Sequence, residues 1–405
     1  MENEVQYGMT LPISEEIDNI KYRQTGEDFY SKVVRIAEAL KDTPDHFENF
    51  KDALRHLRFL PAGRVQNAMG AARQTTAYNC FVSGAIEDSM DSIMGRATDA
   101  AETMRRGGGI GYDFSRLRPR GDRIKSLDSR ASGAVSFMQI FDAVCQTIAS
   151  SGHRRGAQMG VLRVDHPDIE QFITAKNDGT SLTGFNISVG ITDEFMRCLE
   201  KKEPFPLQFE GRVHEEVDPV ALWDMIMRST WDWAEPGVLF IDTINKMNNL
   251  YYCENIEATN PCGEQPLPPY GACLLGSFNL TKYVGAGAFD YGLFTGDIHH
   301  VVRAMDNVID RTIYPLEAQE KEAKNKRRMG LGVTGLANAG EMCGMPYASE
   351  EFMKFTTKIL KTLRDHTYGA SSLLAKEKGS FPFYDKDRYI EGKFFKTLSG
   401  WVQDQ

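Results

Sequence analysis

The stretch of residues 258–273 constrains the fold of this chain more than any other. It reads Ala-Thr-Asn-Pro-Cys-Gly-Glu-Gln-Pro-Leu-Pro-Pro-Tyr-Gly-Ala-Cys, and its prolines and glycines exclude a regular helix or a central strand. A rigid loop remains, because proline fixes φ and glycine permits unusual backbone shapes. This loop places Cys262 between the amide of Asn260 and the carboxylate of Glu264, and the apolar residues 274–278 predict an interior anchor. We therefore predict a reaction centre here.

The composition is typical of a soluble globular protein. Of the 405 residues, 41% are hydrophobic and 25% are charged, and no apolar run is long enough to span a bilayer. The N-terminus lacks the basic and apolar regions of a secretory signal, which indicates a cytoplasmic location. A net charge of -9, without a basic block, argues against a general nucleic-acid binder.

The seven cysteines show no Cys-x-x-Cys pair, and the eight histidines show no metal-ligand pattern, so no metal site is predicted. In a reducing compartment structural disulfides are not expected, so a functional cysteine is expected to act through the reactivity of its thiol. Three cysteines lie among apolar helical residues and are expected in the core; these are Cys145, Cys198 and Cys343. Cys253 fits either role. The other three border turns; these are Cys80, Cys262 and Cys273.

The neighbours of Cys262 indicate which chemistry it performs. A cysteine that acts as an ordinary nucleophile needs a histidine base nearby. None is close in the sequence, whereas Glu264 is. This combination favours redox or radical chemistry with a carboxylate base over acyl transfer.

The order of helix and strand signals predicts an α/β fold. Residues 13–60 are expected to be helical, ending at the Pro and Gly of residues 61–63. Beyond them, helix and strand patterns alternate, which favours a mainly parallel sheet or a barrel. The predicted strands are 112–114, 159–164, 185–189 and 237–241. The predicted helices include 91–104, 132–149, 169–175, 193–199, 219–232, 298–311, 330–343 and 349–376.

Three further features have both an ordinary and a functional interpretation. The run Arg106–Gly111 follows a helix, so it is not a dinucleotide fingerprint; it is either a tight turn with positive φ values or a place where backbone N–H groups approach a substrate. Asp88 stands at a helix start, where capping is the commoner explanation. The pair Arg154–Arg155 is more often a solvated surface than an anion site.

Taken together, these motifs resemble the catalytic subunits of ribonucleotide reductases. The residues that carry the resemblance occur in the family's order; they are Asn260-Pro-Cys-Gly-Glu264 with Cys273, Phe59-Leu-Pro-Ala-Gly-Arg64, Tyr78-Asn-Cys-Phe-Val82, Ile86-Glu-Asp-Ser89, Gly107–Pro119, Arg154–Ala157 and Arg327–Gly335. The resemblance covers residues 50–385. Within the family, the sequence is most similar to the adenosylcobalamin-dependent class, and the class I large subunit comes second.

The resemblance implies a ten-stranded α/β barrel, of the type shared with glycyl-radical enzymes, with the loop at its centre as a finger. Residues 1–60 would be a helical region without an ATP cone, and residues 61–405 a barrel domain without its C-terminal strands. The later strands, the phosphate-binding loop and the C-terminal thiols would follow residue 405. We therefore expect a split or truncated enzyme that binds substrate weakly and does not turn over alone.

The resemblance also implies a role for each site residue. Cys262 would carry the thiyl radical that abstracts the 3′-hydrogen of the ribose, Glu264 would accept the 3′-hydroxyl proton and Asn260 would bind that hydroxyl. Cys80 and Cys273 would be the reducing pair. Other residues would line the substrate ribose, namely Asn79, Gly108 and Gly109. A base that works near neutral pH is expected to be partly buried, and a radical needs a site closed to water.

An effector site is implied as well, and it reverses the ordinary interpretations of Asp88 and Arg155. A deoxynucleotide effector would bind near a homodimer interface, with the loop 176–184 relaying its identity to the substrate. The implied effector residues are Asp88, Ser89, Arg118, Arg155 and Lys176. The helices 91–104 and 132–149 are the candidates for the dimer interface.

The implied activity is the reduction of ribonucleotides, with ribonucleoside diphosphates favoured over triphosphates, to deoxyribonucleotides for DNA synthesis. The implied cofactor is adenosylcobalamin, and the alternative is an external, metal-bearing radical subunit. A thioredoxin- or glutaredoxin-type reductant and a complementing C-terminal polypeptide or segment are the implied partners. Two other hypotheses remain: a nucleotide-binding half that is inactive alone, and a thiol-redox enzyme unrelated to nucleotides, which the Asp88/Arg155 pattern argues against.

Overall fold

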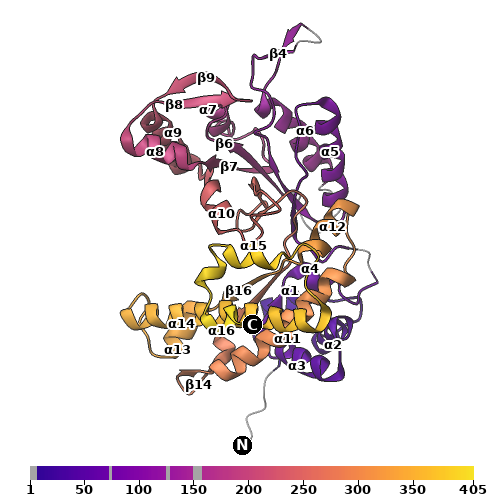
Figure 1. The fold of residues 1–405 in the computed structure, drawn as a ribbon. Coiled ribbons are helices and arrows are strands. Elements are labelled where there is room, and N and C mark those ends of the chain that lie inside the picture. Colours follow the sequence, from indigo (N-terminus) through magenta and orange to yellow (C-terminus); the bar gives the residue numbers. More distant parts are fainter. Residues whose placement is uncertain (1–6, 73–74, 125–127, 149–156) are drawn as a thin grey trace, which may run out of the picture. The chain divides into compact units, whose positions relative to one another are not determined.

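The computed structural model describes residues 7–72, 75–124, 128–148 and 157–405 (Figure 1). The chain divides into two compact units: unit 1 comprises residues 1–79, 273–314 and 320–405, and unit 2 comprises residues 80–272 and 315–319. The boundary predicted between residues 60 and 61 stays a prediction. Of the helices in the described ranges, none combines the length and apolar character needed to cross a membrane.

Unit 2 is built on a five-stranded parallel sheet with the strand order β10-β7-β6-β3-β2. Its strands are β2 (Cys80–Val82), β3 (Gly109–Asp113), β6 (Gln158–Arg163), β7 (Phe185–Ile191) and β10 (Gly237–Phe240). Its helices are α5 (Met90–Arg105), α6 (Ala134–Ile148), α7 (Ile169–Ile173), α8 (Asp193–Lys201), α9 (Pro219–Trp233) and α10 (Ile241–Met247). The two-stranded ribbons are β4 (Arg123–Ile124) with β5 (Ser129–Arg130), β8 (Phe205–Phe209) with β9 (Arg212–Val217), and β11 (Ala258–Thr259) with β12 (Pro266–Leu267).

One face of this sheet is covered by helices, and α5 and α6 lie side by side on it (Figure 1). Alternate residues of the strands point into this core. Ile110 and Tyr112 of β3, for example, are 1% and 0% exposed. The ring of Tyr112 packs edge-on against Phe141 of α6, and its hydroxyl donates to Gln158 Oε1 at 2.8 Å. The residues between them therefore face the opposite side, where the candidate site lies.

Unit 1 has a three-stranded sheet of order β1-β13-β16, in which β13 runs antiparallel to β1 and parallel to β16. Its strands are β1 (Phe59–Pro61), β13 (Leu275–Asn279), β16 (Gly330–Thr334) and the ribbon β14 (Val284–Gly285) with β15 (Ala288–Phe289). Its helices are α1 (Pro12–Lys21), α2 (Phe29–Leu40), α3 (Pro44–Arg55), α4 (Gly63–Ala68), η1 (Leu280–Tyr283), α11 (Tyr291–Arg311), α13 (Leu336–Met342), α14 (Glu350–Lys378), α15 (Lys386–Glu391), η2 (Phe395–Thr397) and α16 (Gly400–Gln403); α12 (Glu317–Lys326) begins in unit 2. A buried ion pair between Arg58 and Asp297, at 2.6 Å, ties β1 to α11.

The mixed α/β class and the parallel sheet are confirmed, and the helical region 13–60 appears as α1 to α3. The ten-stranded barrel is not confirmed, because the sheets formed by the described strands remain open. The helix predicted at 330–343 is wrong in its first half: Gly330–Thr334 is a strand that pairs with β13. Gly335, at φ 72°, then starts the short helix α13, since a left-handed residue ends the extended run.

We predict that Phe141→Ala destabilises the protein by about 3–5 kcal/mol, because it empties a fully buried site beside Tyr112 and Phe114. Urea unfolding measures this loss. Phe240→Ala is the matched control: Phe240 is 43% exposed, so a change within about 0.5 kcal/mol is expected. Equal losses for the two variants would contradict the assignment of this core.

Candidate active site

The cysteine loop, residues 258–272, is a hairpin in unit 2. β11 and β12 form its base, with Ala258 opposite Leu267 and Thr259 opposite Pro266. Inside this base, Asn260 closes the tip: its backbone N–H donates to the Gln265 carbonyl at 3.2 Å, and its Oδ1 accepts the Gln265 N–H at 2.9 Å. The prediction that this stretch forms neither a helix nor a central strand is therefore confirmed, and its rigidity stays a prediction.

Two glycines of β3 allow the loop to lie directly on the sheet. A β-carbon at position 111 would stand 1.8 Å from the carbonyl oxygen of Thr259. A β-carbon at position 109 would stand 2.9 Å from Pro261 Cγ and 3.3 Å from Cys80 Sγ. Distances this short exclude any side chain, so Gly109 and Gly111 leave the space that the loop and the thiol of Cys80 share.

Of the two alternatives derived from the sequence, the tight turn with several positive φ values is wrong, whereas the approach of a substrate stays a prediction. Only Gly107 has a positive φ among the glycines of 107–111, and Gly109 and Gly111 belong to a strand. What approaches them is the chain's own loop. Gly108 faces the helix-covered side of the sheet, where a β-carbon would stand 2.7 Å from the ring of Phe81. The lack of a side chain at Gly108 therefore makes room for Phe81. The substrate roles of Gly108 and Gly109 stay predictions.

The three residues at the tip differ in exposure. Asn260 is completely buried, and its Nδ2 has no hydrogen-bond partner among the described residues. A buried donor without a partner is costly, and the role of this amide in binding a substrate hydroxyl stays a prediction. Cys262 and Glu264 are exposed. The structure leaves the Glu264 side chain exposed rather than partly buried as expected.

The other predicted cysteines are buried, Cys80 at 3% and Cys273 at 2% exposure. In unit 1, the Asn79 N–H donates to the Cys273 carbonyl at 3.2 Å, and Asn79 Oδ1 is buried without a partner in the described part of the chain. In unit 2, Phe81 pairs with Ala272 in an antiparallel bridge. Residues on either side of Cys80 thus pair with Cys273 or with its neighbour.

The end of the loop pairs with β2, the edge strand of the sheet. The Val82 N–H donates to the Gly271 carbonyl at 2.8 Å, and the Tyr270 N–H donates to the Val82 carbonyl at 3.1 Å. Tyr270, at φ 65°, also accepts a hydrogen bond from Arg96 of α5. The loop is therefore held at its start by β3 and at its end by β2.

The predicted effector residues lie elsewhere in unit 2. Asp88 does not cap α5, since Ser89 is the N-cap and accepts the Ser92 N–H at 3.2 Å. Asp88 instead accepts from Arg118 Nε at 2.6 Å, so these two predicted residues are brought together. Lys176 contacts the Phe185 carbonyl and Glu235. Arg155 lies outside the described residues. The effector role of this set stays a prediction.

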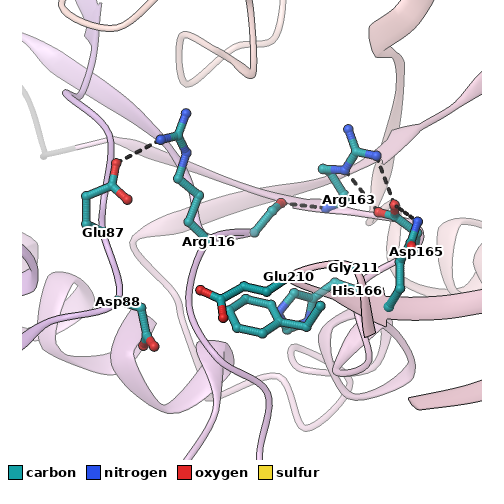
Figure 2. Close-up of a pocket in the computed structure, with 11 residues that line it drawn as sticks. Glu87, Asp88, Arg116, Arg163, Asp165, His166, Glu210 and Gly211 are labelled. Atoms are coloured by element: carbon teal, nitrogen blue, oxygen red, sulfur yellow. Dashed lines mark hydrogen bonds and ion pairs between the residues drawn. The ribbon is translucent and has the colours of Figure 1, made fainter. Parts of the chain in front are cut away.

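A polar pocket of about 550 Å³ lies next to Asp88, under the turn of the β8–β9 hairpin (Figure 2). Its charged lining consists of four carboxylates and two arginines, with a buried histidine; these are Glu87, Asp88, Asp165, Glu210, Arg116, Arg163 and His166. Both arginines are already in ion pairs, Arg116 with Glu87 and Arg163 with Asp165 (Figure 2). This charge balance does not favour a phosphate group.

Asp113 lies beside the start of the cysteine loop, on the same face as Gly109 and Gly111. Its Oδ1 accepts both the N–H and the hydroxyl of Ser115, at 3.1 and 2.5 Å. Burial raises the pKa of Asp113 to about 7, and the nearby charge of Glu257 adds to the rise. Asp113 therefore changes charge near neutral pH, next to the candidate site.

Sequence reasoning missed Asn186, whose Nδ2 donates to the Pro261 carbonyl at 2.7 Å. Its signal was a polar residue within the apolar strand 185–189, which alternation places on the face opposite the core. Asp113 gave no local signal, because its burial comes from distant residues. In the described parts of the chain, no cluster of three or more His, Cys, Asp or Glu residues could hold a metal ion.

Residues 78–404 match the family model "Ribonucleotide reductase, barrel domain". The chain is 41% identical over 345 residues to a vitamin B12-dependent ribonucleoside-diphosphate reductase of Mycobacterium tuberculosis, covering 84% of this chain and 50% of that protein. It is 36% identical over 403 residues to the protein of that name from Thermoplasma acidophilum, covering 96% and 52%. A ribonucleoside-diphosphate reductase subunit alpha of Chlamydia pneumoniae is 26% identical over 380 residues, covering 85% and 36%. The chain spans about half the length of the first two relatives.

We predict that Gly111→Ala destabilises the protein by about 1–3 kcal/mol, because the new methyl group collides with the backbone of Thr259 and displaces the loop. Urea unfolding provides the measurement. Gly95→Ala in α5 is the control: nothing lies within 4 Å of its added methyl group, so a gain of up to about 1 kcal/mol is expected. Wild-type stability of Gly111→Ala would contradict the close contact.

We predict that Asp113→Asn stabilises the protein at pH 8 by about 2 kcal/mol and leaves it unchanged at pH 4, as followed by thermal unfolding. A carboxyl group with a raised pKa favours the folded state at low pH, and this advantage is lost as the pH rises from 3.8 through about 7.

Asp178→Asn is the control of opposite sign. The Ser181 hydroxyl and the backbone N–H groups of residues 180 and 181 lower the pKa of Asp178 to about 2. This variant should lose stability at pH 8 rather than gain it, and the loss should fade as the pH falls from 3.8 towards 2. The same pH profile for both variants would contradict the assignment of Asp113.

Proposed function

This chain belongs to the ribonucleotide reductase family, and we propose from this premise that it takes part in reducing ribonucleoside diphosphates to 2′-deoxyribonucleotides for DNA synthesis. The observation that carries the proposal is the site itself. A buried amide, an exposed thiol and an exposed carboxylate share one rigid hairpin tip, and the Cys80 thiol lies on the same sheet face.

Each residue then has a role that its position supports. The Cys262 thiyl radical abstracts the 3′-hydrogen of the ribose, and Glu264 accepts the proton of the 3′-hydroxyl. The Nδ2–H of Asn260 donates to that hydroxyl oxygen, which gives this buried group the partner it lacks among the described residues. Asn79, Gly108 and Gly109 complete the proposed ribose site.

Cys80 and Cys273 are the proposed reductants. Together they supply two electrons and two protons: one proton lets the 2′-hydroxyl leave as water, the other becomes the new hydrogen at C2′, and the two sulfurs end as a disulfide. The pairings of Asn79 with Cys273 and of Phe81 with Ala272 support this, because they bring the neighbours of Cys80 to the segment that carries Cys273. A thioredoxin- or glutaredoxin-type protein would restore the thiols.

The proposed cofactor is adenosylcobalamin, which supplies the unpaired electron when it is bound. Two relatives named as vitamin B12-dependent are 41% and 36% identical to the chain, against 26% for the Chlamydia subunit alpha, which favours this class over a metal-bearing radical subunit. The exposed Cys262 fits this proposal, because a radical source can reach its thiol. The residues of this chain hold and orient that thiol.

Cys262 and Glu264 are exposed, whereas a radical requires a site closed to water. We therefore propose that a complementing polypeptide or a further segment covers the cysteine loop and completes the ten-stranded barrel. The outer edge of β10 supports this, since among the described strands β10 pairs with β7 alone. The proposed effector site at Asp88, Ser89, Arg118, Arg155 and Lys176, and a homodimer around α5 and α6, belong to the same complete protein.

We predict that Cys262→Ala lowers deoxyribonucleotide formation by about 10³-fold or more, since it removes the radical carrier. The assay contains a ribonucleoside diphosphate, adenosylcobalamin, dithiothreitol and the complementing polypeptide. Cys253→Ala is the matched control, because Cys253 is also an exposed thiol but lies outside the loop, and it should retain wild-type activity. Activity that survives Cys262→Ala would exclude the radical role, and a requirement for a metal-bearing partner instead of cobalamin would exclude this class.

A further inference from the structure

Asn186 of β7 bonds directly to the peptide that precedes Cys262. Its Nδ2 donates to the carbonyl oxygen of Pro261 at 2.7 Å, and Pro261 is the residue before Cys262. The strand neighbours Phe185 and Ile187 are buried in the helix-covered core at 1% and 2% exposure, so Asn186 points from the opposite face. This is the face on which the cysteine loop lies.

The other hydrogen bonds that hold the loop end on neighbouring residues rather than on the carbonyl of Pro261. The β11–β12 pairing ends at Thr259 and Pro266, and the bonds of Asn260 reach Gln265 and the N–H of Gly263. Proline has no N–H of its own, so Pro261 can form a backbone hydrogen bond only through its carbonyl. On the other side Gly263, at φ 82°, gives the chain a flexible joint.

We propose that Asn186 is a positioning residue that fixes the direction in which the Cys262 side chain leaves the loop. It acts on the carbonyl of Pro261 and does not touch the substrate. The inference deepens the proposed function and rests on it for its catalytic consequence, because hydrogen abstraction requires the reacting atoms within about 3–3.5 Å of each other. The positional consequence can be measured on the chain alone.

The first experiment compares wild-type protein with Asn186→Asp and Asn186→Ala. Asp has the shape of Asn but no donor, so it places a carboxylate against the Pro261 carbonyl. We expect hydrogen exchange of the Gly263 and Gln265 amides to become about fivefold faster, the factor that one lost hydrogen bond produces. The rate of Cys262 alkylation by iodoacetamide, relative to Cys253 in the same molecule, should rise as well.

Asn49→Asp is the matched control. Asn49 also donates from Nδ2 to a backbone carbonyl, that of Asp45 at 2.9 Å, but on an exposed helix of unit 1. It undergoes the same chemical change and should leave both measurements at the wild-type values. If the two Asn186 variants also match wild type in amide exchange and in the alkylation ratio, the proposal is overturned.

The second experiment measures deoxyribonucleotide formation by the completed enzyme. A positioning role predicts a lower kcat with an unchanged KM for the ribonucleotide in Asn186→Asp, and partial recovery in Asn186→Gln, which keeps the donor. A raised KM with an unchanged kcat would overturn the positioning role. An inactive wild-type enzyme would refute the proposed function, while the exchange and alkylation results would still decide the role of Asn186.

Discussion

The architecture of the candidate site depends on the lack of a side chain at two positions of β3, Gly109 and Gly111. At Gly111 of β3 the backbone lies against the backbone of Thr259, and at Gly109 it lies against the ring of Pro261. These contacts set the height of the cysteine loop above the sheet, and they leave the thiol of Cys80 beside Pro261. The hydrogen bonds of Asn186 to Pro261 and of Asn260 to Gln265 then restrain the conformation of the cysteine loop on the sheet.

Much of this was predictable where local signals are strong. The helices α5, α6 and α14, the strands β6 and β7, and a rigid loop around Cys262 follow from periodicity, caps and proline. The sequence left the glycines of β3 either in a tight turn or at a substrate, because a single sequence cannot show that another segment of the chain lies on them. The same limit explains 330–343, where glycines obscured a strand whose partner, β13, lies about fifty residues earlier.

The tip of the loop separates structural from chemical work. Asn260 is buried and uses its oxygen to close the hairpin, whereas Cys262 and Glu264 are exposed. Partial burial of Glu264 was expected from its proposed work as a base near neutral pH, whereas the side chain is exposed. Exposure is a property of everything that surrounds a group, so it could not be derived from the loop's own residues.

The hold on the loop through its backbone has a further consequence. Thr259 and Pro261 are held through their carbonyl groups, and the glycines of β3 contribute only the absence of side chains. The scaffold is therefore indifferent to the chemical identity of the atom presented at position 262. A selenol or another reactive group of similar size could therefore replace the thiol of Cys262, and the sheet beneath the loop would not have to change.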